Sequence, residues 1–245
     1  MIPLPLRDNV LRRRFPVVTL GVISINTLAW LLQLVHGVDL SVLDYGLIPA
    51  WLVHGMREGP LIVRGVGQVW LHQEIPFPLT VLSSMFMHAG WLHVLGNMWF
   101  LWVFGGRVED AMGRAWFALF YLASGLAAAA THVLVGLGAA VPMVGASGAI
   151  AGVLGAYAVL YPRARVRCVW VLIVFVTFIE FRAWLLLGVW FVSQFFVPGP
   201  GVAWAAHVGG FVAGAGLILL FPPRLSALTE PVARSREYGV VAPRR

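Results

Sequence analysis

The sequence predicts an all-α, polytopic membrane protein built as a bundle of six transmembrane helices. Three observations support this fold class. Of the 245 residues, 60% are hydrophobic and only 11% are charged, less than half of the roughly 25% that soluble domains carry. Uncharged stretches are long enough to cross a bilayer, which takes about 20 apolar residues. The arginines lie between these stretches in a pattern that distinguishes the two sides of a membrane.

The uncharged stretches give the number and position of the spans. Stretches of 24, 32, 48 and 41 residues cover 15–38, 75–106, 115–162 and 183–223. The first two hold one span each. The two longest hold two each, because turn signals rich in glycine and proline interrupt them at 136–142 and 198–201. We therefore expect spans near 16–36, 89–106, 115–136, 146–162, 183–197 and 202–221.

Arginine placement orients the bundle. All seventeen basic residues are arginine. With six alternating spans, fifteen of them fall on one side, and Arg57 and Arg64 fall on the other. The arginine-rich side, which holds both termini, is cytoplasmic by the positive-inside rule, so we expect a multi-pass protein of the plasma (inner) membrane. This distribution explains the net charge of +7 with the lipid bilayer as partner and no nucleic acid.

Three segments make up the expected domain organisation. Residues 1–15 form a cytoplasmic segment, 16–221 the six-span membrane domain, and 222–245 a polar cytoplasmic tail without fixed structure. Within the membrane domain, the outer loop 37–80 is too apolar for a solvated loop, yet glycines interrupt it. Two interpretations stay open: the loop lies at the membrane interface with its aromatic residues at headgroup depth, or it packs on the tops of the spans.

Residues 166–181 contain an apolar run that we do not count as a span. Its uncharged part, 168–179, would reach about 18 Å as a helix, well short of the roughly 30 Å hydrocarbon core. An extra span would also put the starts of the fourth and sixth spans at opposite faces of the bilayer. We therefore expect this segment on the cytoplasmic side, in the interface or packed against the bundle.

Polar side chains inside spans are costly in hydrocarbon, so they mark candidate functional sites. His93 and Asn97 are four residues apart near the start of the second span and share one face of that helix. Ser147 starts the fourth span, and His207 lies near the start of the sixth. These three spans run in the same direction, so the four residues share a depth in the outer part of the bilayer. His88 precedes an Ala-Gly pair and is expected at the lip of the site.

Small residues flank the serine and the last histidine. Gly148 and Gly152 form a G-x-x-x-G edge after Ser147, and the same spacing recurs after His207. Two glycine-lined helices can pack closely enough to bring the serine hydroxyl within hydrogen-bond reach of the imidazole. A neutral histidine can then take the serine proton as the hydroxyl attacks an amide, which is the first step of acyl transfer.

The oxyanion formed in such a reaction needs hydrogen-bond donors. The first backbone N–H groups of the fourth span have no partner within the helix, and Asn97 and His93 can add side-chain donors. The acids nearest the site along the chain are Glu74, Glu109 and Asp110, and the last two fall at the opposite membrane face. Catalysis here would therefore use a Ser-His dyad, and the sequence indicates no cofactor.

Each polar residue also has a structural interpretation. A serine in a glycine-rich span commonly serves helix packing alone, and we interpret His132 as a bundle-facing or lip histidine. A zinc site from His88, His93 and His207 is disfavoured, because residues 88 and 93 do not share a helix face. Three further polar residues are expected as interhelical hydrogen-bonding groups, namely Asn26, Ser124 and Gln194.

Four motifs resemble those of the rhomboid family, whose members are intramembrane serine proteases with a six-helix core. They read H-A-G-W-L-H-V-L-G-N at 88–97, G-G-R-V-E-D at 105–110, G-A-S-G at 145–148 and A-H-V-G-G at 206–210. The resemblance extends from about residue 80 to 221. It implies that Ser147 is the nucleophile and His207 the general base. It also implies an oxyanion hole formed by His93, Asn97 and the backbone N–H of Ser147.

Two positions depart from the pattern of that family. Many members have an aromatic residue one turn after the nucleophile that stacks on the base, where this chain has Ala151. Trp204 and Phe211 are the candidates to supply a ring instead. A Trp-Arg pair common in the first loop is also missing, since neither Arg57 nor Arg64 follows a tryptophan.

Glu109 and Asp110 fall where the resembled family has a motif at the cytoplasmic side. An ion pair with Arg107 or Arg114 suffices to explain them. We therefore expect them to have a structural role, away from the chemistry.

The sequence thus predicts a serine endopeptidase of the rhomboid type that cleaves transmembrane segments of membrane proteins. The resemblance implies substrates that are transmembrane helices with helix-destabilising residues, which is physically reasonable because a helical backbone hides its carbonyls and must unwind to be cut. Water must reach the serine, so we expect a polar cavity that opens outward and is lined by His88, His93 and Asn97. Two alternatives are a protease-inactive relative that binds transmembrane clients and a small-solute transporter. The intact Ser147 and His207 disfavour the first, and the clustering of polar residues at one depth disfavours the second.

Overall fold

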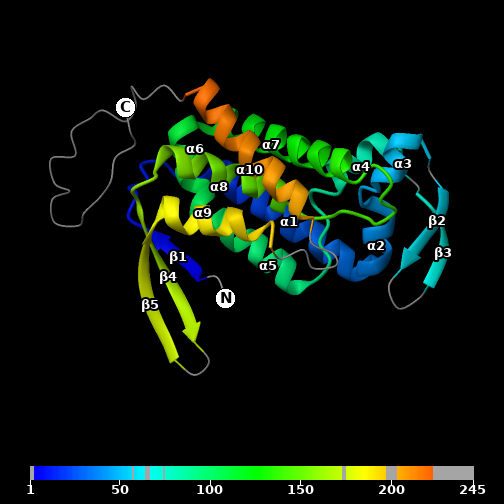
Figure 1. The fold of residues 1–245 in the computed structure, drawn as a ribbon, viewed down its shortest axis with the longest axis horizontal. Helices are drawn as coiled ribbons and strands as arrows, with labels where there is room; N and C mark the ends of the chain where they lie inside the picture. The colour runs from blue at the N-terminus through cyan, green and yellow to red at the C-terminus, as the bar shows by residue number, and fades with distance from the viewer. Residues whose placement is uncertain are drawn as a thin grey trace.

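Long helices run roughly side by side along the long axis of the molecule, and a β-hairpin projects from one end (Figure 1). The computed structural model describes residues 3–56, 58–63, 67–73, 75–172, 175–196 and 203–222. The turn expected at 198–201, nearly all of the tail 222–245, and Arg57, Arg64 and Glu74 lie outside the described residues.

Helices occupy all six places where spans are expected. The second is continuous but irregular, because α5 passes through a π-helical turn, η1, into α6. Two helices, α1 and α7, are long and apolar enough by themselves to cross a membrane, and α8, α9 and α10 are shorter apolar helices. The bounds are α1 Val17–His36, α5 Trp91–Phe100, η1 Leu101–Gly105, α6 Gly106–Met112, α7 Arg114–Val135, α8 Ser147–Leu160, α9 Ala183–Ser193 and α10 Trp204–Leu220.

The described chain is mainly helical, as predicted, but it also contains strands, so the all-α part of the prediction is corrected. The segment expected at 166–181 folds as an antiparallel hairpin of β4 (Arg165–Leu172) and β5 (Phe175–Arg182). β1 (Leu4–Asp8), from the amino-terminal segment, pairs with β4 to complete a three-stranded sheet. The β4–β5 residues are rich in β-branched and aromatic side chains, which favour a pleated strand over a helix. This segment is therefore not a seventh helical span.

The outer loop contains its own short elements. They are α2 (Val38–Tyr45), α3 (Pro49–His54), the hairpin of β2 (Glu58–Val63) and β3 (Gly67–His72), and α4 (Phe77–Ser83). Leu47 is fully buried with Ala129 and Val133 of α7, and its backbone exchanges two hydrogen bonds with Met143. This part of the loop therefore packs on the end of a span, as the second of the two interpretations has it.

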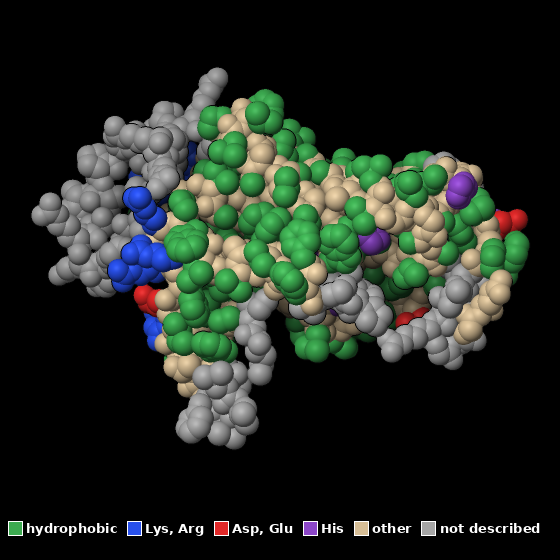
Figure 2. All heavy atoms as spheres, viewed as in Figure 1, with side chains coloured by type: hydrophobic (Ala, Val, Ile, Leu, Met, Phe, Trp, Pro, Cys, Tyr) green, Lys and Arg blue, Asp and Glu red, His purple; other side chains and the backbone are tan. Residues whose placement is uncertain are grey.

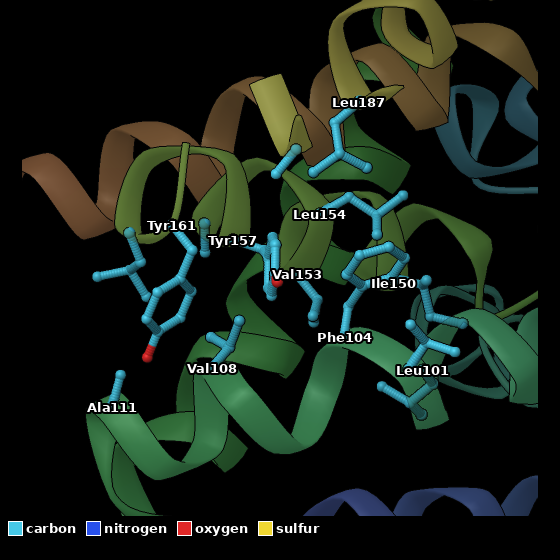
Figure 3. Close-up of a cluster of buried hydrophobic side chains, with 14 of the residues drawn as sticks. Leu101, Phe104, Val108, Ala111, Ile150, Val153, Leu154, Tyr157, Tyr161 and Leu187 are labelled. Atoms are coloured by element: carbon cyan, nitrogen blue, oxygen red, sulfur yellow. The ribbon is translucent and has the colours of Figure 1, made fainter. Parts of the chain in front are cut away.

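The main core lies between α8 and the continuous helix that α5, η1 and α6 form (Figure 3). Leu101, Phe104 and Val108 point from η1 and α6 toward Val153 and Tyr157 of α8, and all of these side chains are buried. The rings of Phe104 and Tyr157 meet edge to face with centroids 4.9 Å apart. Outside this core, apolar side chains cover much of the visible helical surface, and charged side chains lie toward its ends (Figure 2). Such a distribution suits helices that face lipid.

The helices α8 and α10 are in direct backbone contact. A Cβ atom added at Gly210 would collide with the carbonyl group of Gly148, and one added at Gly214 would collide with the backbone of Gly152. The backbones therefore touch directly, which glycine alone among the residues permits. The close packing of two glycine-lined helices expected from the sequence is confirmed.

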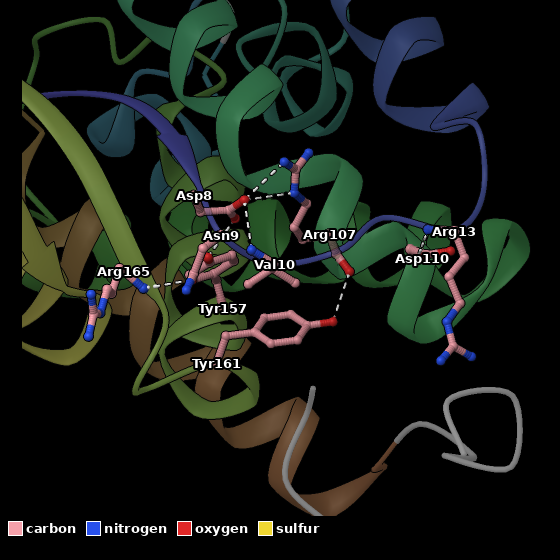
Figure 4. Close-up of polar contacts among 9 residues, drawn as sticks. All are labelled: Asp8, Asn9, Val10, Arg13, Arg107, Asp110, Tyr157, Tyr161 and Arg165. Carbon is pink, nitrogen blue, oxygen red and sulfur yellow. Dashed lines mark hydrogen bonds and ion pairs between the residues drawn. The ribbon is translucent and has the colours of Figure 1, made fainter. Parts of the chain in front are cut away.

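A polar network ties the amino-terminal segment to the arginine-rich end of the bundle (Figure 4). The fully buried Asp8 carboxylate of β1 accepts a hydrogen bond from the Tyr157 hydroxyl at 2.6 Å and pairs with the Arg107 guanidinium at 2.9 Å. Arg165 donates its backbone N–H to the side chain of Asn9. β1 is thus joined to α6, α8 and the hairpin by side chains as well as by strand pairing.

Glu109 and Asp110 have partners other than the expected arginines. Glu109 accepts hydrogen bonds from the backbone N–H groups of Val18 and Thr19, at 3.0 and 2.8 Å, and one from the Thr19 hydroxyl. Asp110 accepts the backbone N–H groups of Arg13 and Arg14. These N–H groups lie at or just before the first turn of α1, where a helix has no internal acceptors and where its dipole favours an anion. The ion-pair interpretation is therefore wrong for Glu109: it caps a helix.

The α8–α10 contact gives a first prediction. Gly214→Val should destabilise the protein by about 1–3 kcal/mol, because the new side chain forces the two backbones apart. Gly216→Val is the matched control, since it lies on the same helix and an added Cβ there has nothing within 4 Å. Thermal melts of the purified variants in detergent measure the difference. Equal melting temperatures for the two variants would contradict the close-contact interpretation.

Candidate active site

A cavity of about 460 Å³ opens among the starts of α5, α8 and α10 and the body of α9. Its polar lining residues come from three helices that begin at the same end of the bundle. The lining residues are Leu92, His93, Gly96, Asn97, Phe100, Val144, Ser147, Ile150, Ala151, Leu154, Trp190, Ala203 and His207.

Ser147 and His207 are in direct contact at the wall of this cavity. Ser147 is the first residue of α8, and His207 lies in the first turn of α10. The Ser147 Oγ atom is 2.8 Å from His207 Nε2, which is the distance of an ordinary hydrogen bond. The two residues are sixty positions apart in the chain, and the glycine contact between α8 and α10 brings them together.

His93 and Asn97 line the same cavity from one face of α5. The Asn97 side chain is 7% exposed, and its Nδ2 atom has no hydrogen-bond partner within the described part of the chain. The backbone N–H of Ala89 donates to His93 Nδ1 at 3.4 Å, so a neutral His93 carries its hydrogen on Nε2. Both side chains therefore bring a free donor to the neighbourhood of Ser147.

Gly145 sets how close His93 comes to the serine. Its φ of +125° lies in a region that side-chain-bearing residues rarely adopt. A Cβ atom at this position would lie 2.6 Å from His93 Nε2 and 3.5 Å from Ser147 Oγ. The Gly145 N–H donates to the carbonyl oxygen of Ser84 at 2.8 Å, which fixes the loop that leads into α8.

His88 does not lie at the lip of the cavity. Its side chain is completely buried, and His88 Nδ1 is 3.2 Å from the carbonyl oxygen of Phe86. The ring packs edge to face against His93 with centroids 5.1 Å apart, while Gln33 of α1 exchanges two hydrogen bonds with the His88 backbone. The expected cavity-lining role is therefore wrong, because the chain turns inward before α5 and His88 supports the His93 ring from behind.

The second ring nitrogen of His207 has a partner from α9. His207 Nδ1 is 2.7 Å from Gln194 Oε1. Gln194 therefore bonds between helices as expected, whereas Asn26 donates to Val22 in its own helix. Ser124 Oγ and His132 Nδ1 are buried without a hydrogen-bond partner among the described residues.

The aromatic neighbour of the histidine is Trp190, which sequence reasoning missed. Its ring lies 6.0 Å from the His207 ring at an interplanar angle of 39°. The two candidates named from the sequence lie elsewhere: Phe211 packs against Trp190, and Trp204 against Phe195. Trp190 precedes Gln194 by one helical turn, and this spacing alone predicts that both side chains lie on the same side of the helix.

Among the described residues, no group of three His, Cys, Asp or Glu side chains is arranged so that it could hold a metal ion. The rings of His88 and His93 are close, but His88 Nδ1 is already turned to a backbone carbonyl.

A bundle of apolar helices around a mainly apolar cavity that holds four polar side chains is the architecture of a polytopic helical membrane protein. The family model of the rhomboid domain matches residues 77–224, more than half of the chain. The chain therefore belongs to the rhomboid family.

Three known relatives share between 29% and 37% of their aligned residues with this chain. Rhomboid protein 1, mitochondrial, of Saccharomyces cerevisiae is 29% identical over 66% of this chain and 48% of its own length. Rhomboid-like protein 11, chloroplastic, of Arabidopsis thaliana is 37% identical over 37% of this chain and 32% of its own. The presenilin-associated rhomboid-like protein, mitochondrial, of Bos taurus is 30% identical over 55% and 36%. The chain thus spans between about a third and a half of the length of these relatives.

The Gly145 geometry gives a second prediction. Gly145→Ala should cost about 1–3 kcal/mol of stability, because the alanine must adopt a strained backbone conformation and displace the His93 ring. Gly138→Ala, in the same connection between α7 and α8, is the control, since an added Cβ there meets nothing within 4 Å. Thermal melts compare the two. A Gly145→Ala protein as stable as the Gly138→Ala protein would mean that the turn tolerates a side chain.

Proposed function

We propose that this protein is an intramembrane serine endopeptidase that cleaves transmembrane segments of other membrane proteins. The observation that carries the proposal is the 2.8 Å contact between Ser147 Oγ and His207 Nε2 at the wall of a cavity. Membership of the rhomboid family, whose members are generally proteases of this class, supports the same conclusion.

The dyad supplies both the nucleophile and the proton carrier. His207 Nε2 takes the proton of the Ser147 hydroxyl as Oγ attacks the scissile carbonyl carbon. When the tetrahedral intermediate collapses, the C–N bond breaks and His207 gives that proton to the leaving amine. Water then attacks the acyl-serine ester, with His207 again as the base, and the second product leaves as a carboxylic acid. The proton returns to Ser147, so the site ends each cycle unchanged.

The oxyanion of each tetrahedral intermediate would be held by donors from two helices. The backbone N–H of Ser147 is at the start of α8, where helical N–H groups lack internal partners. Asn97 Nδ2 is buried without a partner in the described chain. His93 carries its ring hydrogen on Nε2, beside Gly145. Donors fixed before the reaction stabilise developing charge without reorganisation.

The substrate is proposed to be a membrane-anchored segment that can unwind locally. An intact helix keeps its carbonyl groups in internal hydrogen bonds, so a residue must leave the helix before Ser147 can reach it. The apolar part of the cavity lining, which includes Phe100, Ile150 and Leu154, suits a side chain of such a segment.

For the topology we propose six spans, with the arginine-rich end on the cytoplasmic side. Three described helices that carry site residues, α5, α8 and α10, begin at the cavity and end toward the arginine-rich end. The names of the relatives place those proteins in mitochondria and chloroplasts, and none of them supports the plasma membrane expected from the sequence. We therefore propose a location in an inner membrane, in this orientation.

The proposed dyad gives a third prediction. Ser147→Ala and His207→Ala should each abolish cleavage of a single-span model substrate by the detergent-purified protein. The double variant should be no worse than either, because the two residues act as one unit. Cleavage fragments are measured by mass spectrometry. Full cleavage by Ser147→Ala would exclude the mechanism, and substrate binding without cleavage by the unaltered protein would favour a client-binding role.

The proposed oxyanion hole gives a fourth prediction. Asn97→Ala should lower kcat about 10²-fold, the scale of one lost oxyanion donor, with little change in melting temperature because Nδ2 has no hydrogen-bond partner among the described residues. Initial rates and thermal melts of the same preparation test both parts. A variant that unfolds, or one that turns over at the normal rate, would remove Asn97 from the oxyanion hole.

A further inference from the structure

We propose that Gln194 is a positioning residue for the general base: its amide oxygen fixes the tautomer and the orientation of the His207 imidazole. This inference rests on the proposed function and deepens it. It gives the site a third member, in the place where serine proteases of other folds hold a carboxylate. The main observation behind this proposal is the 2.7 Å contact between Gln194 Oε1 and His207 Nδ1.

The orientation of the Gln194 amide is set by its other contacts. Its Nε2 group donates to the carbonyl oxygen of Trp190 at 3.1 Å and lies 3.4 Å from Ser193 Oγ. The amide nitrogen is thus turned toward its own helix, and the amide oxygen faces the histidine. An amide oxygen accepts hydrogen bonds and cannot donate them.

This orientation decides which nitrogen of the neutral imidazole carries the hydrogen. Nδ1 must donate to Gln194 Oε1, so Nε2 presents its lone pair to the Ser147 hydroxyl. That is the tautomer a general base needs, because only a free lone pair can take the serine proton. Without the acceptor on Nδ1, the ring also populates the opposite tautomer, which cannot act as the base.

The same helix restrains the ring in a second way. Trp190, one turn before Gln194, lies against His207 with a centroid distance of 6.0 Å. On the α8 side, the residue one turn after Ser147 is Ala151, which is too small to hold the ring. The carboxyl-terminal end of α9 therefore restrains the base twice, through the hydrogen bond of Gln194 and through the tilted ring of Trp190.

A neutral hydrogen-bond acceptor such as the Gln194 amide also suits a site inside a bundle of apolar helices. A carboxylate in an apolar surrounding pays a large desolvation cost unless a cation is close. Among the described residues, His93 and His132 are the ionisable groups whose charge would bear on His207, and neither supplies a permanent positive charge. An amide provides the hydrogen bond without placing a charge there.

Kinetics of Gln194 variants test the proposal in the full-length protein. Gln194→Leu removes the acceptor at similar size, Gln194→Glu keeps it and adds charge, and Val192→Ala is the control, because Val192 is a half-exposed position on the same helix outside the cavity lining. We expect Gln194→Leu to lower kcat about tenfold with KM unchanged, the scale of one lost hydrogen bond. Gln194→Glu should retain most of kcat.

The pH profile separates positioning from a merely structural role. In Gln194→Glu the protonated His207 ring is itself the close cation that the new carboxylate needs, so the pair stabilises the protonated base and the acidic limb of the kcat profile should move to higher pH. In Gln194→Leu it should not move in that direction. A kcat for Gln194→Leu within about twofold of that of the Val192→Ala control, or an unmoved acidic limb in Gln194→Glu, would overturn the proposal.

A measurement without substrate keeps this proposal distinct from the proposed function. In protein labelled with ¹⁵N-histidine, and with the His207 signals assigned by loss in His207→Ala, the neutral ring should carry its hydrogen on Nδ1. Gln194→Leu should populate the Nε2–H form. If no substrate is cleaved but this pattern is found, the proposed function fails and the positioning stands. A ring with its hydrogen on Nε2 in the unaltered protein overturns the positioning, whatever the cleavage result.

Discussion

The direct backbone contact between α8 and α10 is the constraint on which the candidate site depends. Gly148 and Gly152 on one helix face Gly210 and Gly214 on the other, and no side chain separates them. Apolar helices gain little from the hydrophobic effect against one another in lipid, so close packing has to supply the contact energy. The same approach sets the 2.8 Å distance between Ser147 and His207. The packing of α8 against α10 and the proposed Ser147–His207 chemistry therefore both depend on the lack of side chains at these four glycines.

The opposite end of the bundle is held by charged groups. Glu109 caps the start of α1, and Asp8 joins β1 to Arg107 and Tyr157. These contacts lie at the arginine-rich end, away from the cavity, and the apolar core connects the two ends through Phe104 and Tyr157.

Each helix around the cavity makes a separate contribution. α8 and α10 bring together the proposed nucleophile and base, and α5 presents two donors from one face. α9 contributes no reacting group, but Trp190 within it and Gln194 at its end are both neighbours of the His207 ring. Buried His88 supports His93 in a similar way. The groups proposed to react are thus surrounded by side chains that limit their orientation.

The sequence by itself determined the six helical positions, the two glycine edges and the four residues that meet at the cavity. Hydropathy reports burial along a segment, and residues three or four apart in a helix share a face, so these features can be read from local patterns. Helix direction also follows from charge, which put Asn97, Ser147 and His207 at one depth.

Only the tertiary structure decided the rest. The pairing of β1 with β4 and the capping of α1 by Glu109 join segments far apart in the chain, and no local pattern encodes such a partner. The inward turn of His88 and the choice of Trp190 over Trp204 and Phe211 depend on how helices rotate against each other. Residue types and their periodicity fix which face of a helix is polar, but the rotation and separation of the helices determine which atoms on that face meet.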